Sequence, residues 1–225
     1  MKTLAKFSGI AYLLIFISGF YANFAILGSL IDLGSSAKTT INIIGNSIQF
    51  RNGLFGFLAM LVADIFLIWS LFEFTKPANK RVAYVASLLR GFHALFFIIA
   101  LFRLIEIYHI TYKATNSIEL QATVINLLSE FDMFWTIGLL FFGAHLVTLS
   151  FLCLKFKSIP KLISLLLVIA ALGYFVDGLA KLYFQDYLDY QFYFEVVVIL
   201  TAVIGELSFT IWLLILGFSR QNEKV

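Results

Sequence analysis

The sequence predicts an all-α integral membrane protein, a six-helix antiparallel bundle. Its composition indicates this class because 61% of the residues are hydrophobic, phenylalanine alone occurs 26 times, and only 13% of the residues are charged. Six apolar stretches of about 20 residues follow one another with short connections, and a helix of about 20 apolar residues spans the hydrocarbon core of a bilayer. No room remains for a separate soluble domain, so we expect one transmembrane domain over residues 1–225.

The first predicted span runs from Phe7 to about Leu27, after Lys2 and Lys6. Its apolar run exceeds that of a signal peptide and contains no small-residue cleavage site, so we expect it to remain in the membrane. One face of this helix carries small and polar residues that suit packing against neighbouring helices, namely Ser8, Tyr12, Gly19 and Asn23.

Two polar segments interrupt the apolar pattern. Between residues 28 and 50, Ser35 or Ser36 can cap a helix that continues to Ile48 with apolar residues at a helical period. Between residues 108 and 130, Asn116 or Ser117 can cap another helix that ends near Leu128. We expect both to be short amphipathic helices in the outer loops of the bundle.

Five further spans complete the bundle. They are predicted at about Gly53–Phe74, Val82–Ile107, Phe131–Leu154, Leu162–Phe184 and Phe194–Phe218. Near their ends, Asp177 with Lys181 and Arg103 with Glu106 have the spacing of exposed helical ion pairs. The single cysteine, Cys153, has no second cysteine for a disulfide or a CxxC site.

Basic residues predict the orientation, because cytoplasmic connections carry an excess of lysine and arginine. One side of the predicted bundle has Lys2, Lys6, Lys76, Lys80, Arg81, Lys155, Lys157, Lys161, Arg220 and Lys224. The other side has Lys38, Arg51, Arg103, Lys113 and Lys181. We therefore expect a multi-pass protein of the bacterial cytoplasmic membrane with both termini in the cytoplasm. These clusters lie beside spans, so they indicate topology and no nucleic-acid partner.

Five ionisable residues are predicted near the middle of the membrane: Asp64, Arg90, His93, His145 and Glu206. Counted from the cytoplasmic bases, they lie about 13–21 Å deep at about 1.5 Å per helical residue. A charge at this depth costs about 2.5–3.5 kcal/mol on insertion scales, so each should face the bundle interior and have a partner. We expect Asp64, Arg90, His145 and Glu206 to converge within hydrogen-bonding or one-water reach.

Three further residues are secondary candidates for a site. Arg51 stands at the entrance of the second span and Asp177 near the far end of the fifth. Glu195 lies on nearly the same helix face as Glu206, so the two carboxylates can line a path from the outer surface inward.

This polar layer leaves several functions open. It can bind a small or lipidic ligand or relay protons in an ion-coupled carrier, or it can only fix helix packing through buried salt bridges. A third alternative is an intramembrane hydrolase or transferase that acts on a lipid through a metal held by His93, His145, Asp64 and Glu206. A haem between the two histidines is also conceivable by depth. No fixed-spacing metal motif occurs, so we expect no cofactor, and we expect membrane lipids as partners.

The chain resembles a known family over nearly its whole length. The stretches that carry this resemblance are FSGIAYLLIFISGFYANF, FRNGLFGFLAMLVADIFL, IGLLFFGAHL, IPKLISLLLVIAALGYFVDGL and AVIGELSFTIWLL. They are similar to the bacterial membrane proteins grouped as domain of unknown function 4386. The polar positions of that family fall on Arg51, Asp64, Arg90, His145, Asp177 and Glu206, whereas His93 is outside the pattern. The resemblance implies a multi-pass membrane protein and no particular activity, substrate or cofactor.

Overall fold

The computed structural model of the chain describes residues 1–32, 34–156 and 159–219. Within these ranges, six helices are long and apolar enough to cross a membrane, and there is no strand. The predicted all-α membrane bundle is therefore confirmed. Three bases used to predict the orientation, Lys157, Arg220 and Lys224, lie outside the described residues.

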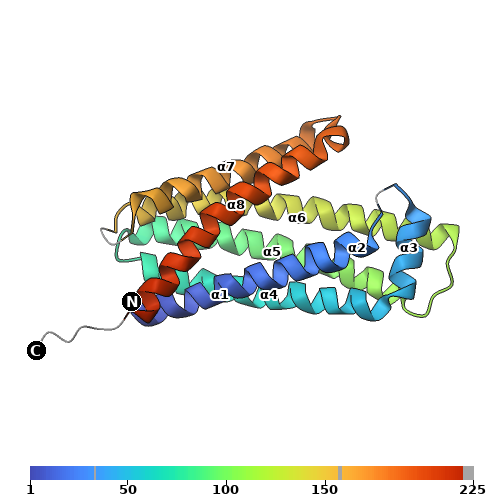
Figure 1. The fold of residues 1–225 in the computed structure, drawn as a ribbon, viewed down its shortest axis with the longest axis horizontal. Helices are drawn as coiled ribbons and strands as arrows, with labels where there is room; N and C mark the ends of the chain where they lie inside the picture. The colour runs from blue at the N-terminus through green and yellow to red at the C-terminus, as the bar shows by residue number, and fades with distance from the viewer. Residues whose placement is uncertain (33, 157–158, 220–225) are drawn as a thin grey trace, which may run out of the picture.

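The first span is continuous from Lys2 to Leu30. It consists of α1 (Lys2–Phe20), a π-helical segment η1 (Tyr21–Leu27) and a last turn α2 (Gly28–Leu30). The other spans are α4 (Ser47–Thr75), α5 (Lys80–Thr111), α6 (Ile118–Cys153), α7 (Lys161–Tyr183) and α8 (Tyr187–Phe218). The short helix α3 (Ser36–Gly45) crosses one end of the bundle (Figure 1).

The two short amphipathic helices predicted from capping residues have different outcomes. The helix after Ser35 is confirmed as α3, and the Ser35 hydroxyl accepts a hydrogen bond from the Lys38 amide at 3.3 Å. It ends at Gly45, however, and Ile48 already belongs to α4. The second helix is not a separate element. Ser117 caps it as predicted, but α6 then continues without interruption to Cys153. The reason is that residues 118–130 contain neither glycine nor proline, so nothing in this segment ends the helix before the membrane span begins.

The six spans pack in a closed order. α1 contacts α4, α4 contacts α5, α5 contacts α6, α6 contacts α7, α7 contacts α8, and α8 returns to α1. α1 begins and α8 ends at one end of the bundle, which we call the termini end, and α3 covers the other, which we call the α3 end (Figure 1). Side chains from all six helices can therefore meet in the interior.

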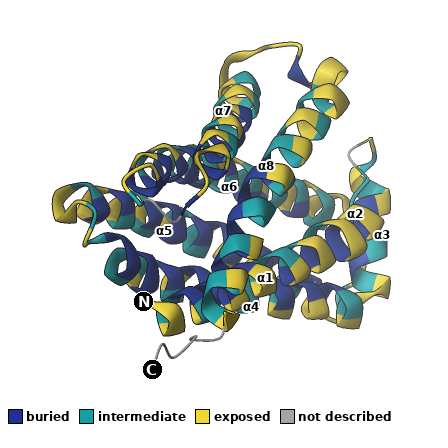
Figure 2. Cartoon of the chain, turned by 60° about the vertical axis from the view of Figure 1, so that its left-hand side comes forward, coloured by how far each residue is buried: buried dark blue, intermediate teal, exposed yellow. Residues whose placement is uncertain are grey.

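Two hydrophobic cores divide this interior along the bundle axis. The core of the termini end draws on α1, α4, α6, α7 and α8. The core of the α3 end includes residues of η1, α4, α5 and α6, but its described members include none from α7 or α8. Figures 1 and 2 show why, because α7 and α8 lean away from the other helices toward this end and present many exposed residues there.

The helix contact near the termini end keeps α7 and α8 attached to the bundle. A Cβ atom on Gly205 of α8 would lie 2.6 Å from the carbonyl oxygen of Leu166 in α7, so the two backbones touch at this point. Gly217 of α8 packs in the same way against the backbone of Lys6 in α1. The bundle is therefore tight at the termini end and open between α8 and the first span at the α3 end.

Candidate functional site

Arg90 lies at the centre of the polar side chains inside the bundle. Its side chain is 1% exposed, and its Nη2 donates to Oδ1 of Asp64 at 2.6 Å, which makes a buried ion pair. Its Nη1 donates to the Tyr12 hydroxyl at 2.9 Å and lies 3.2 Å from Nε2 of His145. The guanidinium also lies 5.2 Å from the centre of the Phe142 ring, within cation–π distance. Arg90 thus joins α1, α4, α5 and α6.

The contacts of His145 define its proton positions. Nδ1 lies 2.8 Å from the Ala86 carbonyl oxygen, which can only accept a hydrogen bond, so Nδ1 carries the hydrogen. Nε2 faces Arg90, which has only donors, and must therefore accept. The imidazole is neutral and both of its nitrogens are in use, so His145 has no free lone pair for a metal or a haem iron.

His93 has one unsatisfied nitrogen that faces Asp64. By the same argument Nδ1 donates to the Gly138 carbonyl oxygen at 3.0 Å, which leaves Nε2 as an acceptor in the neutral ring. Nε2 lies 3.8 Å from Oδ2 of Asp64, too far for a hydrogen bond. Oδ2 is itself buried and has no hydrogen-bond partner among the described residues. Two acceptors therefore face each other without a donor between them.

Glu206 belongs to the same depth but has a different partner. Its Oε1 accepts a hydrogen bond from the Tyr174 hydroxyl at 2.7 Å, and the residue is 6% exposed. No salt bridge to Glu206 occurs in the part of the chain that the structure describes. The predicted convergence thus brings Asp64, Arg90 and His145 into direct contact, whereas Glu206 bonds to α7. We call this set the polar layer, and each of the six spans supplies a member: Tyr12, Asp64, Arg90, His93, His145, Tyr174 and Glu206.

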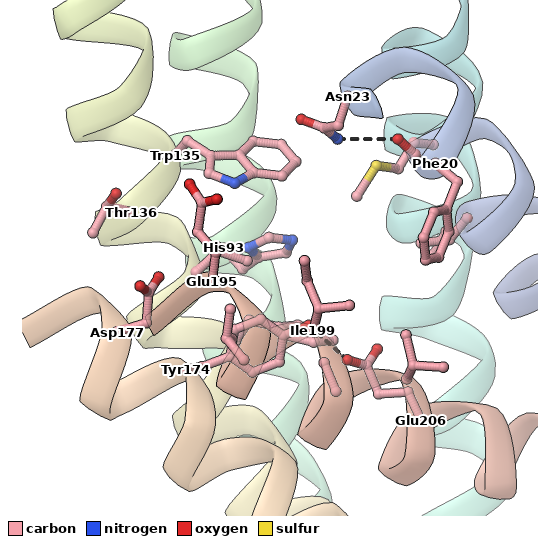
Figure 3. A pocket seen from close by; sticks show the side chains of 18 of the residues that line it. Phe20, Asn23, His93, Trp135, Thr136, Tyr174, Asp177, Glu195, Ile199 and Glu206 are labelled. Carbon is pink, nitrogen blue, oxygen red and sulfur yellow. Dashed lines mark hydrogen bonds between the residues drawn. The ribbon is translucent and has the colours of Figure 1, made fainter. Parts of the chain in front are cut away.

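A cavity of about 480 Å³ extends from the polar layer into the space that α7 and α8 leave open. Figure 3 shows His93, Tyr174 and Glu206 on its polar side, with Trp135 and Phe20 among its aromatic walls. Asn23 of η1 also lines the cavity, and its side-chain amide donates to the Gly19 carbonyl oxygen at 3.1 Å. The π-helical segment therefore forms part of the wall, and such segments are frequent at functional sites.

Three more carboxylates line the cavity farther toward the α3 end. Asp132 of α6 forms an ion pair with Lys181 of α7, with 2.5 Å between the charged atoms. Asp177 accepts from the Tyr187 hydroxyl at 2.8 Å, and Glu195 accepts from the Gln191 amide at 2.6 Å. The predicted pair of Asp177 with Lys181 is therefore wrong, because Lys181 finds a carboxylate on the neighbouring helix. The predicted pair of Arg103 with Glu106 is confirmed at 3.0 Å.

The candidate residues named from the sequence fall into three places. The cavity is lined by Asp64, Arg90, His93, Asp177, Glu195 and Glu206. His145 lies behind Arg90 and is not among the lining residues, while Arg51 is exposed at the start of α4. Within the described residues, no group of three or more histidine, cysteine, aspartate or glutamate side chains is placed to hold a metal. The four-residue metal set is therefore not assembled among the described residues.

Sequence reasoning missed the hydroxyl groups that complete the layer. Tyr12 was assigned only to helix packing, and Tyr174 was not singled out. Both tyrosines stand within apolar helical sequence, where a tyrosine can pack with its ring alone. The residue type therefore does not by itself indicate a polar site. Counting depth would have indicated Tyr174, which lies 13 residues after Lys161 and hence about 20 Å from that base at about 1.5 Å per helical residue.

Comparisons with known proteins assign the chain to a family. A family model described as a domain of unknown function (DUF4386) matches residues 7–217. An uncharacterized protein of Archaeoglobus fulgidus is 27% identical over 162 residues, which cover 72% of this chain and 82% of that protein. No solved structure matches the chain. Because the family model covers nearly all of the six-helix bundle, the chain belongs to the DUF4386 family of membrane proteins.

Proposed function

We propose that this protein binds a small amphipathic or lipidic molecule in the cavity between the first span, α6, α7 and α8. The observation that carries the proposal is the cavity itself, about 480 Å³ with apolar and aromatic walls and a polar end at Glu206 and Asp64. Ligand sites in proteins usually combine a mostly apolar lining with a few converging polar groups. A cavity that served only packing would be filled by side chains.

We further propose that the ligand enters from the extracytoplasmic side. The positive-inside rule places the termini end in the cytoplasm, because most of the basic connections are there. The α3 end then faces outward. The cavity extends from the polar layer toward that end, since its lining residues include Asn23, Phe131 and Glu195. The opening between α8 and the first span also gives an amphipathic molecule a route from the outer leaflet.

Carriage across the membrane is a second candidate function. It is favoured by Glu206, which is 6% exposed and has no basic partner among the described residues. Ionisable residues at this depth are typical of proton and substrate pathways in transporters. The alternative of a metal-dependent enzyme is not supported by any group of three or more potential metal ligands among the described residues.

The binding proposal is tested by filling the cavity. Ala202 lines the cavity on α8, so Ala202→Phe places a ring inside it, whereas Ile204→Phe adds the same ring on the exposed face of α8. Both variants and the original protein are purified into lipid nanodiscs, and the bound molecules are identified by native mass spectrometry, before and after incubation with a total lipid extract. We expect one bound species to be lost in Ala202→Phe and kept in Ile204→Phe. Identical bound species in all three proteins, or none in any, would contradict the proposal.

A further inference from the structure

The charges that line the cavity do not balance. Five carboxylates line it, from Asp64, Asp132, Asp177, Glu195 and Glu206, against two basic side chains, Arg90 and Lys181. Arg90 is paired with Asp64 and Lys181 with Asp132. Asp177, Glu195 and Glu206 therefore remain without a basic partner among the described residues. A cavity beside lipid with this excess favours a positively charged occupant.

Acceptors without a donor also gather at the buried end of the cavity, where Arg90 Nε is a buried donor that likewise has no partner among the described residues. Oδ2 of Asp64 is buried and unpartnered in the described part of the chain, and Nε2 of His93 faces it at 3.8 Å as a second acceptor. Glu206 adds a third acceptor, because Tyr174 bonds to Oε1 and no other described residue donates a hydrogen bond to its carboxylate. Unsatisfied buried acceptors are costly, so a donor supplied from the cavity would relieve the cost at this point.

Aromatic rings line the space next to these acceptors. Trp135 and Phe20 stand on opposite walls (Figure 3). At the polar layer the ring of Tyr174 lies 5.4 Å, centre to centre, from the ring of Phe142. The faces of aromatic rings attract cations, most strongly when water is excluded, and they also accommodate apolar groups. The same walls therefore suit both parts of a molecule with a cationic head and an apolar body.

We propose that the ligand is an organic amine, a primary or secondary ammonium group on an apolar body. The ammonium group lies between Glu206, His93 and Asp64, where its N–H groups supply the missing donors, and the apolar body extends along the aromatic walls toward the opening between α8 and the first span. This inference rests on the proposed function. The proposed function states only that the cavity binds an amphipathic or lipidic molecule. The present inference specifies in addition that this molecule carries a positive charge and N–H donors.

Matched probes separate charge from donors. Binding of 4-phenylbutylamine, 4-phenylbutanol, 4-phenylbutyrate and the N,N,N-trimethyl derivative of the amine is measured by calorimetry on protein in nanodiscs, with empty nanodiscs subtracted. We expect the primary amine to bind at least about tenfold more tightly than the alcohol, since hydrogen bonds to charged groups are worth more than neutral ones. The trimethyl derivative should be weaker than the amine because it has no N–H donor, and the anionic butyrate should be weakest.

Variants locate the cationic group. Glu206→Gln should lower the affinity for the amine at least about tenfold and leave the affinity for the alcohol unchanged. Glu195→Gln should give a smaller loss of affinity for the amine. Because Glu195 is exposed at the cavity mouth, this variant should fold normally and tests the charge effect even if Glu206→Gln does not fold. Glu106→Gln removes an exposed carboxylate at the α3 end that pairs with Arg103 outside the cavity, and should change neither affinity.

The outcomes distinguish this inference from the proposed function. If the alcohol or the butyrate binds as tightly as the amine, and Ala202→Phe abolishes that binding, the cavity binds ligands but the amine assignment is overturned. If no probe binds and Ala202→Phe loses no bound species, both the proposed binding function and the amine assignment are refuted. Nanodiscs of phosphatidylglycerol alone and nanodiscs with added phosphatidylethanolamine separate two sources of the amine. A lipid headgroup as ligand would make the added phosphatidylethanolamine compete with 4-phenylbutylamine, whereas a free amine would not.

Discussion

Removing the Asp64 carboxylate should strand a buried arginine and destabilise the bundle. Arg90 and Asp64 are 1% and 2% exposed, and 2.6 Å separates their charged atoms. Breaking a buried ion pair by removing one partner costs about 3–5 kcal/mol. In Asp64→Asn the amide oxygen can still accept one hydrogen bond, and Arg90 keeps Tyr12 and His145. We therefore expect a loss of about 3 kcal/mol in the free energy of unfolding, at the lower end of that range.

The measurement is reversible unfolding in mixed micelles, titrated with a denaturing detergent and followed by tryptophan fluorescence. A double-mutant cycle with Arg90→Gln should give a coupling energy of at least about 2 kcal/mol, since the two residues are in direct contact. Glu206→Gln provides the contrast. Glu206 bonds to Tyr174 and a glutamine oxygen can still accept from that hydroxyl, so its coupling with Arg90 should be below about 0.5 kcal/mol, as for sites without a shared partner.

Two results would refute this reasoning. One is a decrease of less than about 1 kcal/mol in the free energy of unfolding of Asp64→Asn, because an uncompensated guanidinium in the interior should destabilise the fold by more than that. The other is a larger coupling of Arg90 with Glu206 than with Asp64, which would mean that the pairing seen in the structure is not the one that stabilises the bundle.

Two further predictions test the packing and the topology. Gly205→Ala should weaken the contact of α7 with α8 by about 1–3 kcal/mol, because its Cβ would meet the backbone oxygen of Leu166 at 2.6 Å, whereas Gly91→Ala has no atom within 4 Å and should be neutral or stabilising in the same unfolding assay. Cysteine placed at Lys38 should react with an impermeant maleimide added to intact cells and cysteine at Lys80 should not. Equal labelling at both positions would refute the orientation.

The arrangement of the spans was predictable because a bilayer imposes one dominant requirement on sequence. Every apolar stretch of about 20 residues must form a helix to satisfy its backbone, so the stretches alone identify all six spans. The π-helical segment η1 was not predictable on this basis. Its residues Tyr21–Leu27 continue the apolar pattern of α1, and the extra backbone residue per turn leaves no mark on composition.

Depth predicted which ionisable residues meet, but it did not predict which ones pair. Asp64 and Glu206 lie at similar depth, and either could have compensated Arg90. The order of the helices decides between them, because α4 packs directly beside α5 whereas α8 packs against α1 and α7. Lys181 shows the same limit, since Asp177 is near in sequence but Asp132 of α6 is the partner. Pairing depends on which helices are neighbours, and the sequence of a single chain does not contain that information in any local pattern.

The polar layer therefore consists of two parts that differ in whether their buried charge has a partner of opposite charge. Around Arg90 the buried guanidinium charge is compensated by Asp64, with Tyr12 and the neutral His145 as further partners, so this part holds four helices in register. Around Glu206 a single neutral hydroxyl supports a buried carboxylate, and the adjoining cavity is open. A carboxylate that only served packing would cost less as glutamine, which keeps the bond to Tyr174 without a buried charge. What distinguishes glutamate at this position is its affinity for a positive group or a proton that the described residues do not supply, and the cavity is where such a group can enter.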